Sequence, residues 1–280
     1  MIRFLLVFIL FLAAQPWAQT QTPQRVVSLN MCLDPLLLQL LPPERLVSLT
    51  YLSGQSQLSA ISDQVRELVQ ARGLLLNHGL AEELVPLAPD LILAGEFGAT
   101  DAVALLQQQG YRVEKLGLPQ GLADIASHLR QLGSLLGEEE RAEAMASQLE
   151  QKLAQMDYRE LPESSRPRAL WYAPNGFVTG RFTLEDELMQ RAGYRNLAAE
   201  QGLQGFVQLD LEALLTLAPE VLIVEAGYVE SFSLAREYLH HPALVRNSRK
   251  LELPAALSVC AVPQVAEALA SLVNARESQP

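Results

Sequence analysis

The chain has 280 residues, of which 49% are hydrophobic and 6% aromatic, and its formal net charge is −11. This length suffices for one large domain or two smaller ones, with mostly aliphatic cores. The negative charge argues against binding to nucleic acid or to an anionic membrane surface, because both attract clustered Lys and Arg.

Residues 1–18 have the layout of a secretory signal peptide. Arg3 gives a positive start, residues 4–14 are apolar throughout, and Pro16 ends that run just before Ala18, a suitable cleavage residue. The apolar run is too short to span a bilayer, which takes about 20 residues. We therefore expect residues 1–18 to be removed and the mature chain to be exported, with a retained anchor as the alternative.

Strand and helix patterns alternate in residues 19–120, the predicted N-terminal lobe. Short runs rich in Val, Ile and Leu predict strands, and helical patterns between them include one that begins at Pro35 and one that ends at Gly110. Such alternation builds a parallel sheet with crossover helices. The predicted strands are residues 25–29, 45–50, 90–95 and 112–117.

Residues 121–157 form a predicted helical segment that joins the two halves of the chain. Residues 138–140 are three glutamates, which suit the first turn of a helix because the helix dipole favours negative charge there. Apolar residues then recur every three or four positions, the pattern of a long amphipathic helix. This apolar stripe consists of Ala142, Met145, Leu149, Leu153 and Met156.

The alternation resumes in residues 158–280, the predicted C-terminal lobe. Thr183 is a predicted N-cap and Gly193 a predicted stop for one helix, and residues 262–273 predict a closing helix. The predicted strands are residues 168–173, 220–227 and 250–254.

One pattern occurs in both lobes. Residues 82–95 (EELVPLAPDLILAG) and residues 212–225 (EALLTLAPEVLIVE) share Glu, Leu, Leu, Ala and Pro at the same five places. Each copy predicts a short helix that ends at a proline, Pro89 or Pro219, and a buried strand directly after it. We therefore predict an α/β protein with two similar Rossmann-like lobes, joined by a long α-helix, and a ligand cleft between the lobes.

These motifs, in this order and spacing, resemble the helix-linked periplasmic binding proteins of ABC importers for iron–siderophore, haem and vitamin B12. The matching motifs run from residue 25 to about residue 273 and include RVVSLN, LVSLTYLS and both copies of the repeat. The resemblance implies a periplasmic monomer that is not an enzyme and needs no cofactor. Such a protein captures a corrinoid or ferric chelate, for example cobalamin or a ferric siderophore, and delivers it to permease subunits in the inner membrane.

Candidate ligand-binding residues follow the predicted strands, because ligands of open α/β sheets lie beyond the carboxyl ends of the strands. Aromatic and amide side chains in these loops suit a planar, partly apolar ligand. Each candidate also has a structural alternative, such as capping a helix or filling the core, and the core is the interpretation we favour for Trp171. The candidates are Asn30, Cys32, Tyr51, His78 and Glu96 in the first lobe and Tyr172, Asn175 and Tyr228 in the second.

The two cysteines, Cys32 and Cys260, follow strand-like runs that we expect to end near the junction of the lobes. Free thiols seldom persist in exported proteins, so these two residues are candidates for a disulfide. Two buried thiols and a soft-metal site are the alternatives.

Glu82 and Glu212 open the two copies of the repeat, each in the first turn of its predicted helix. Compensation of the helix dipole is a sufficient structural reason for an acid there. In the family that the chain resembles, similar glutamates dock onto arginines of the permease, one from each lobe. The resemblance therefore implies a docking role for both residues.

Two other functions stay open at this point. A binding protein for a bare transition metal ion needs about three His and a carboxylate that converge, whereas this chain has four His in all, two of them adjacent. We therefore predict no metal site. An exported enzyme is the remote alternative, and the sequence contains no nucleophile elbow, zinc-protease motif or phosphate-binding loop.

Overall fold

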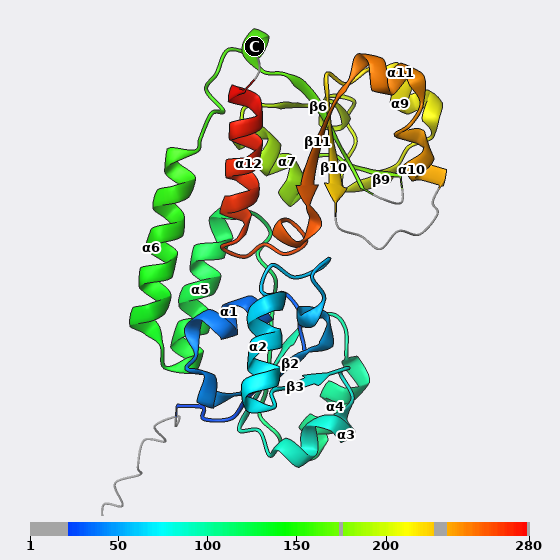
Figure 1. The fold of residues 1–280 in the computed structure, drawn as a ribbon. Helices are drawn as coiled ribbons and strands as arrows, with labels where there is room; N and C mark the ends of the chain where they lie inside the picture. The colour runs from blue at the N-terminus through cyan, green and yellow to red at the C-terminus, as the bar shows by residue number, and fades with distance from the viewer. Residues whose placement is uncertain (1–21, 174–175, 227–233, 279–280) are drawn as a thin grey trace, which may run out of the picture.

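A computed structural model of the chain describes residues 22–173, 176–226 and 234–278, and the predicted signal peptide lies outside these residues. Two α/β lobes are stacked in Figure 1, the N-terminal lobe below and the C-terminal lobe above, with helices α5 and α6 alongside. The predicted fold class, two α/β lobes with connecting helices, is therefore confirmed.

The N-terminal lobe contains a five-stranded parallel sheet in the order β3-β2-β1-β4-β5. The central strands β1 and β4 are buried along their whole length, as expected when helices cover both faces of a parallel sheet. The strands are β1 (Val26–Ser28), β2 (Leu46–Thr50), β3 (Leu75–Asn77), β4 (Leu91–Gly95) and β5 (Val113–Leu116). The helices are α1 (Asp34–Leu40), α2 (Ser62–Arg72), α3 (Ala81–Leu84) and α4 (Thr100–Gln108), with 3₁₀ turns at Pro43–Arg45, Tyr51–Gly54 and Val85–Leu87.

Two helices, α5 (Leu122–Leu136) and α6 (Glu139–Gln155), connect the lobes. The predicted amphipathic helix is α6, and it packs antiparallel against α5 after the turn at Gly137 (Figure 1). Arg130 of α5 forms ion pairs with Glu143 and Glu150 of α6 across the outer side of the pair. The link between the lobes is thus a helical hairpin rather than the single helix that the apolar stripe predicted.

The C-terminal lobe has a six-stranded mixed sheet in the order β11-β10-β6-β7-β9, with β8 paired to β6. Strands β6, β10 and β11 are parallel, whereas β7 runs antiparallel to both β6 and β9. The strands are β6 (Arg168–Tyr172), β7 (Phe177–Thr179), β8 (Arg195–Asn196), β9 (Phe206–Gln208), β10 (Val221–Ala226) and β11 (Arg249–Pro254). The helices are α7 (Leu184–Arg191), α8 (Leu197–Glu200), α9 (Leu211–Leu217), α10 (Leu234–Tyr238), α11 (Pro242–Asn247) and α12 (Val265–Glu277), with 3₁₀ turns at Glu163–Ser165 and Ala255–Leu257.

The local signals for helix ends act as expected in α7. The Thr183 side chain accepts a hydrogen bond from the Asp186 backbone N–H, which caps the helix, and Gly193 adopts a left-handed φ of 81° just after it. No helix among the described residues is long and apolar enough to cross a bilayer.

The repeat has the same geometry in both lobes. In each copy a helical turn ends in an alanine with left-handed backbone, Ala88 with φ 44° or Ala218 with φ 46°, and the proline and a buried strand follow. In Figure 1 the two helices that begin these copies, α3 and α9, lie on the side of the molecule away from α6.

A single hydrophobic core cluster runs through both lobes and the helical hairpin. It joins Val26 of β1 and Leu132 of α5 to Trp171 of β6 and Leu269 of α12. Successive residues of a strand face opposite sides of its sheet, so Val27 and Leu170 belong to two separate clusters on the outer faces. The two lobes therefore share part of one core.

Candidate ligand site at the junction of the lobes

The carboxyl ends of the N-terminal strands meet the C-terminal lobe. Strand pairing places Thr50 of β2 opposite Asn77 of β3, so the next residues, Tyr51 and His78, leave the sheet side by side. Asn30 follows β1 and Glu96 follows β4 at the same edge. The chain reverses its direction of winding between β1 and β4, the place where open α/β sheets bind ligands.

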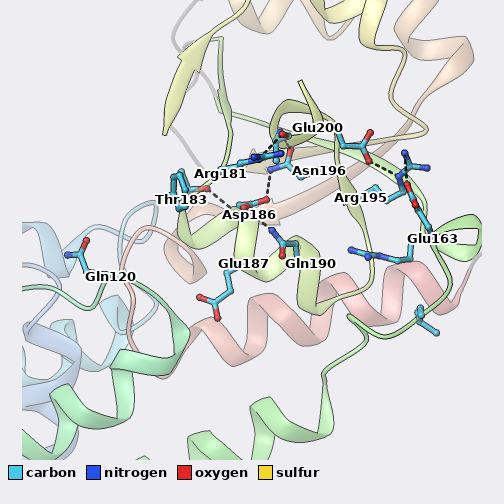
Figure 2. A pocket seen from close by; sticks show the side chains of 14 residues that line it. Gln120, Glu163, Arg181, Thr183, Asp186, Glu187, Gln190, Arg195, Asn196 and Glu200 are labelled. Carbon is cyan, nitrogen blue, oxygen red and sulfur yellow. Dashed lines mark hydrogen bonds and ion pairs between the residues drawn. The ribbon is translucent and has the colours of Figure 1, made fainter. Parts of the chain in front are cut away.

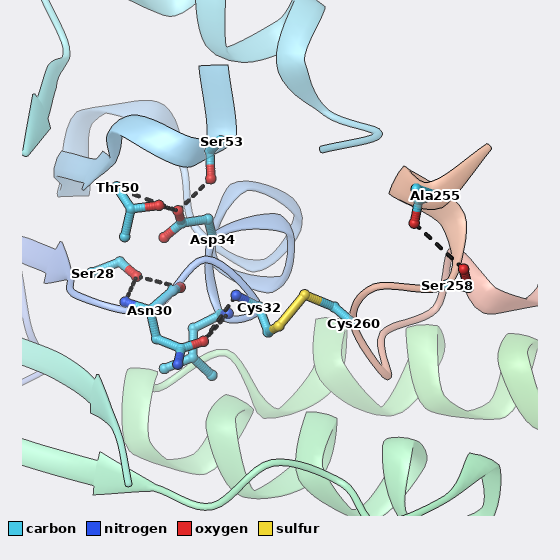
Figure 3. The surroundings of a disulfide bond; sticks show 10 residues. Ser28, Asn30, Cys32, Asp34, Thr50, Ser53, Ala255, Ser258 and Cys260 are labelled. Atoms are coloured by element: carbon cyan, nitrogen blue, oxygen red, sulfur yellow. Dashed lines mark hydrogen bonds between the residues drawn. A yellow bond between two sulfur atoms is a disulfide. The ribbon is translucent and has the colours of Figure 1, made fainter. Parts of the chain in front are cut away.

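A disulfide joins the lobes at this edge. Cys32, in the loop after β1, is bonded to Cys260, in the loop between β11 and α12, and the two Cα atoms are 5.3 Å apart (Figure 3). The described residues include no free cysteine. The alternatives of two buried thiols and a soft-metal site are therefore wrong, and Cys32 offers no thiolate to a ligand.

Asn30 holds the loop that carries Cys32. Its side-chain oxygen accepts hydrogen bonds from the backbone N–H of Cys32 at 2.8 Å and of Leu33 at 3.3 Å. Its amide also lies against Gly95, where a β-carbon would come within 2.3 Å of Asn30 Nδ2. These contacts give Asn30 a structural task beside any role in ligand binding.

Asp34 anchors helix α1 to the end of β2. The carboxylate is fully buried and accepts hydrogen bonds from the backbone and hydroxyl of Thr50 and from the hydroxyl of Ser53 (Figure 3). Burial raises the pKa of Asp34 to about 6, although these hydrogen bonds act to lower it.

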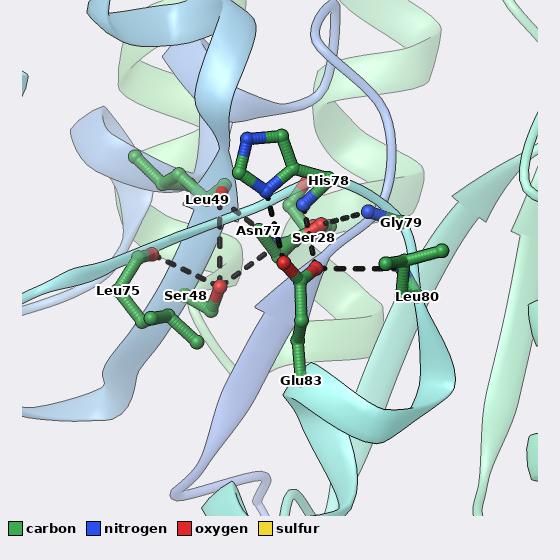
Figure 4. Close-up of polar contacts among 9 residues, drawn as sticks. All are labelled: Ser28, Ser48, Leu49, Leu75, Asn77, His78, Gly79, Leu80 and Glu83. Carbon is green, nitrogen blue, oxygen red and sulfur yellow. Dashed lines mark hydrogen bonds and ion pairs between the residues drawn. The ribbon is translucent and has the colours of Figure 1, made fainter.

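Tyr51 and His78 form a stacked pair of rings, with centroids 4.7 Å apart and an interplanar angle of 25°. His78 Nδ1 lies 2.9 Å from Glu83 Oε1, and Glu83 Oε2 accepts the backbone N–H of His78 at 2.7 Å (Figure 4). Below the pair, the buried amide of Asn77 donates to Ser28, Ser48 and Leu49 and fixes the end of β3. Both rings remain accessible, with 40% of Tyr51 and 59% of the His78 side chain exposed.

Two further aromatic residues are exposed in loops that follow strands. Phe97, next to Glu96 in the loop after β4, is 83% exposed. Phe182, in the turn before α7 of the other lobe, is 84% exposed and has a left-handed φ of 66°, a conformation that is rare for an aromatic residue. Phe182 was not among the predicted residues, and no local pattern distinguishes its exposed ring from a core phenylalanine.

The prediction that Tyr172 binds ligand is wrong. Tyr172 and its neighbour Trp171 are both fully buried, because β6 lies inside the sheet and is covered on both faces. Burial raises the pKa of Tyr172 to about 12. Trp171 is in the core, as predicted, and its indole N–H donates to Glu225 at 3.0 Å. Asn175 and Tyr228, the other candidates in this lobe, lie outside the described residues.

The strongest comparison with known proteins is a family match. The model of a family described as periplasmic binding protein matches residues 75–249, more than half of the chain. The chain belongs to the periplasmic binding protein family. This family is a class of binding proteins.

Relatives of this periplasmic binding protein include two with named ligands. A cobalamin-binding protein of Halobacterium salinarum is 23% identical over 265 residues, which cover 90% of this chain and 69% of the relative. A vitamin B12-binding protein of Photorhabdus laumondii is 27% identical over 190 residues, which cover 65% of this chain and 66% of the relative.

Solved structures of similar proteins share the fold. A periplasmic heme-binding protein from Pseudomonas aeruginosa superimposes with a TM-score of 0.71 and 28% identity over 92% of this chain and 94% of that one. A periplasmic vitamin B12-binding protein of Vibrio cholerae superimposes with a TM-score of 0.67 and 18% identity over 92% of this chain and 99% of that one.

The side of the C-terminal lobe carries a groove of about 590 Å³ along α7 (Figure 2). It extends from Gln120 and Phe182 at the junction of the lobes to the ion pair of Glu163 with Arg195. Arg181 lines this groove and donates to the backbone oxygen of Ala199 at 3.0 Å.

Glu187 connects helix α7 to the helical hairpin. Its carboxylate accepts a hydrogen bond from the backbone N–H of Leu122, at the start of α5, at 2.8 Å. Glu185, on the same helix, is buried in the first turn, and burial raises its pKa to about 7, with a further contribution from nearby Glu225. Of these two acids, Glu187 has a structural role at the junction.

Glu82 and Glu212 are exposed in the first turns of α3 and α9. Neither carboxylate has a basic partner among the ion pairs of the described residues, which leaves both available to a binding partner. Glu83, which follows Glu82, points instead to His78.

Proposed function

We propose that this periplasmic binding protein captures a corrinoid or a metal chelate between its lobes and delivers it to the permease of an ABC importer. The observation that carries the proposal is the set of accessible rings at the edge of the N-terminal sheet. Tyr51, His78 and Phe97 come from three loops after parallel strands and offer aromatic surface to a planar ligand.

A corrinoid is the ligand that we favour. The relatives named for cobalamin and vitamin B12 support this choice. The loops that follow the N-terminal strands, residues 29–33, 51–61, 78–80, 96–99 and 117–121, contain no arginine or lysine. This suits a ligand with little negative charge better than an anionic siderophore. The second candidate, a bare metal ion, finds no support in the described residues, which contain no group of three or more His, Cys, Asp or Glu placed to hold one.

Ligand binding is tested by titrating the purified mature chain with cyanocobalamin, haemin and a ferric hydroxamate siderophore. We expect the cobalamin to bind with one-to-one stoichiometry. Calorimetry and the absorbance of the ligand measure this binding. Binding of zinc or manganese ions with no binding of any of the three compounds would overturn the proposal.

We also infer that Glu82 and Glu212 dock the protein onto the permease. Both are exposed, one lies in each lobe, and α3 and α9 occupy the same side of the molecule (Figure 1). Carboxylates that meet arginines form charge-assisted contacts that weaken with salt. Two matching acids on two lobes suit a permease with two-fold symmetry.

The docking role is tested with the double variant Glu82→Ala/Glu212→Ala. We expect loss of permease binding and uptake with unchanged ligand affinity and thermal stability. The matched control is Glu67→Ala/Glu267→Ala, which removes one exposed acid from each lobe at other positions. Uptake by the docking variant at the level of the control would refute the role.

The place of action follows from the same proposal. We infer that the chain is exported to the periplasm, loses residues 1–18 and acts there as a monomer without catalysis or cofactor. The intact mass of protein recovered from the periplasm and its elution in size-exclusion chromatography check the cleavage site and the monomeric state.

A further inference from the structure

Glu83 contacts the ligand site although it lies on a docking helix. It is the third residue of α3, and its side chain reaches back to the loop that carries His78. Only 26% of the Glu83 side chain is exposed, whereas neighbouring Glu82 is exposed. The Glu83 side chain therefore contacts the loop that carries His78 and is mostly shielded from solvent.

The two oxygens of Glu83 have different tasks. Oε2 accepts the backbone N–H of His78 at 2.7 Å and that of Leu80 at 3.5 Å, which fixes the turn at the start of α3. Oε1 lies 2.9 Å from the ring nitrogen Nδ1 of His78. Burial acts to raise the pKa of Glu83, but the hydrogen bonds from His78 and Leu80 outweigh it and hold this pKa below its ordinary value.

An ionised carboxylate can only accept a hydrogen bond, so Nδ1 of His78 carries the proton in this contact. In the neutral ring the lone pair is then on Nε2, at the edge of the ring that points away from Glu83 in Figure 4. The stacked ring of Tyr51 fixes the plane of the imidazole. The orientation of His78 and its tautomer are thus both determined by neighbouring residues.

We propose that Glu83 is a positioning residue of the ligand site, which holds His78 with Nε2 as an electron-pair donor toward the bound ligand. The proposal rests on the proposed function, because it requires the ligand to lie at the sheet edge that carries Tyr51 and His78. An N–H or O–H group of the ligand, or an open axial position on its metal, would take up the lone pair. A carboxylate behind a histidine is the usual way to fix the ring and to increase its basicity.

The first test measures the tautomer in the absence of ligand. Nitrogen-15 NMR of the His78 ring at alkaline pH distinguishes a proton on Nδ1 from a proton on Nε2. We expect the proton on Nδ1 in the wild type and a substantial Nε2-protonated population in Glu83→Gln. A wild-type ring protonated on Nε2 would overturn the proposal whatever the ligand is.

The second test measures ligand affinity. Glu83→Gln keeps an oxygen for the backbone N–H groups of the turn and removes the obligatory acceptor for Nδ1, so it isolates the effect on the ring. We expect about 10-fold weaker binding of aquocobalamin, the size of effect typical for such supporting residues. The matched control Glu67→Gln, at an exposed residue of α2, should bind as the wild type does. Equal affinity of Glu83→Gln and this control would refute the role.

Two cobalamins separate the two uses of the lone pair. Aquocobalamin has an exchangeable axial water, whereas cyanide occupies that position in cyanocobalamin. A similar loss for both ligands indicates a hydrogen bond to Nε2, and a loss for aquocobalamin alone indicates coordination. If the wild type binds neither, the proposed ligand fails, and the NMR result still decides whether Glu83 positions His78.

Discussion

The N-terminal and C-terminal lobes contain the same helix–proline–strand unit in sheets of different topology. Ala88 and Ala218 adopt the same left-handed backbone before the proline, and β4 and β10 follow as buried strands. Around this unit the N-terminal sheet is parallel throughout, whereas β7 and its neighbours make the C-terminal sheet mixed. The shared unit therefore places helices α3 and α9, and the rest of each sheet determines which loops lie at its edge.

This difference explains where residues that follow a strand lie. In the parallel sheet every strand ends at the same edge, so Tyr51 and His78 come together there. In the mixed sheet β7 returns from that edge, and the turn after it carries Phe182. Tyr172, by contrast, is the last residue of β6 itself and stays within the sheet.

The largest effect that we expect comes from breaking the covalent link between the lobes. The Cys32–Cys260 disulfide closes a loop of 228 residues, and Cys32→Ser/Cys260→Ser should lose up to about 5 kcal/mol of unfolding free energy through loop-closure entropy. Urea denaturation of both proteins measures the loss. A variant as stable as the wild type would show that the shared core alone holds the lobes together.

The next effect contrasts one aromatic residue from each lobe. Tyr172→Ala should cost about 3–5 kcal/mol, because it empties a fully buried site. His78→Ala, at an exposed ring, should change stability by less than about 1 kcal/mol and weaken ligand binding instead. Thermal unfolding and calorimetric titration of both variants check this contrast. A Tyr172→Ala variant that keeps its stability and loses ligand affinity would contradict it.

A third comparison concerns one buried acid in each lobe, Asp34 in α1 and Glu185 in α7. Burial raises the pKa of Asp34 from 3.8 to about 6 and the pKa of Glu185 from 4.5 to about 7 in the folded protein. Between the ordinary and the raised value the folded state binds more protons than the unfolded state, so stability falls as pH rises. For Glu185 alone the fall between about pH 4.5 and 7 amounts to about 3 kcal/mol.

Variants separate the two lobes in this pH range. Glu185→Gln should remove the contribution of Glu185 to the fall between about pH 4.5 and 7, and Asp34→Asn should remove the contribution of Asp34 between about pH 3.8 and 6. Urea denaturation at several pH values measures the slopes. A pH profile of Glu185→Gln that runs parallel to that of the wild type would contradict the role of burial.

The smallest effect tests the symmetry of the repeat. Ala88→Gly and Ala218→Gly should each stabilise the protein by about 0.5–1 kcal/mol, because glycine adopts a left-handed backbone without the steric cost that alanine has. Chemical denaturation measures both values. Opposite signs in the two lobes would show that the turns differ in more than their dihedral angles.

Much of the fold could be predicted from local patterns. Buried strands such as β4 and β10 are continuous aliphatic runs, and Thr183, Pro219 and Gly193 act on their own neighbours, so each signal lies within a few residues of its effect. The short strands β7 and β9 have three residues each and no such run. They form only because their partners in the sheet satisfy their backbone hydrogen bonds.

The sequence by itself determined the two-lobed α/β fold and the repeated turn, because periodicity and stop signals are local. The tertiary structure alone decided that Tyr172 is buried, that Cys32 meets Cys260 and that Phe182 is exposed. These outcomes depend on which strands become neighbours and on which faces helices cover. They join residues that are far apart in the chain, and no pattern within one segment contains that information.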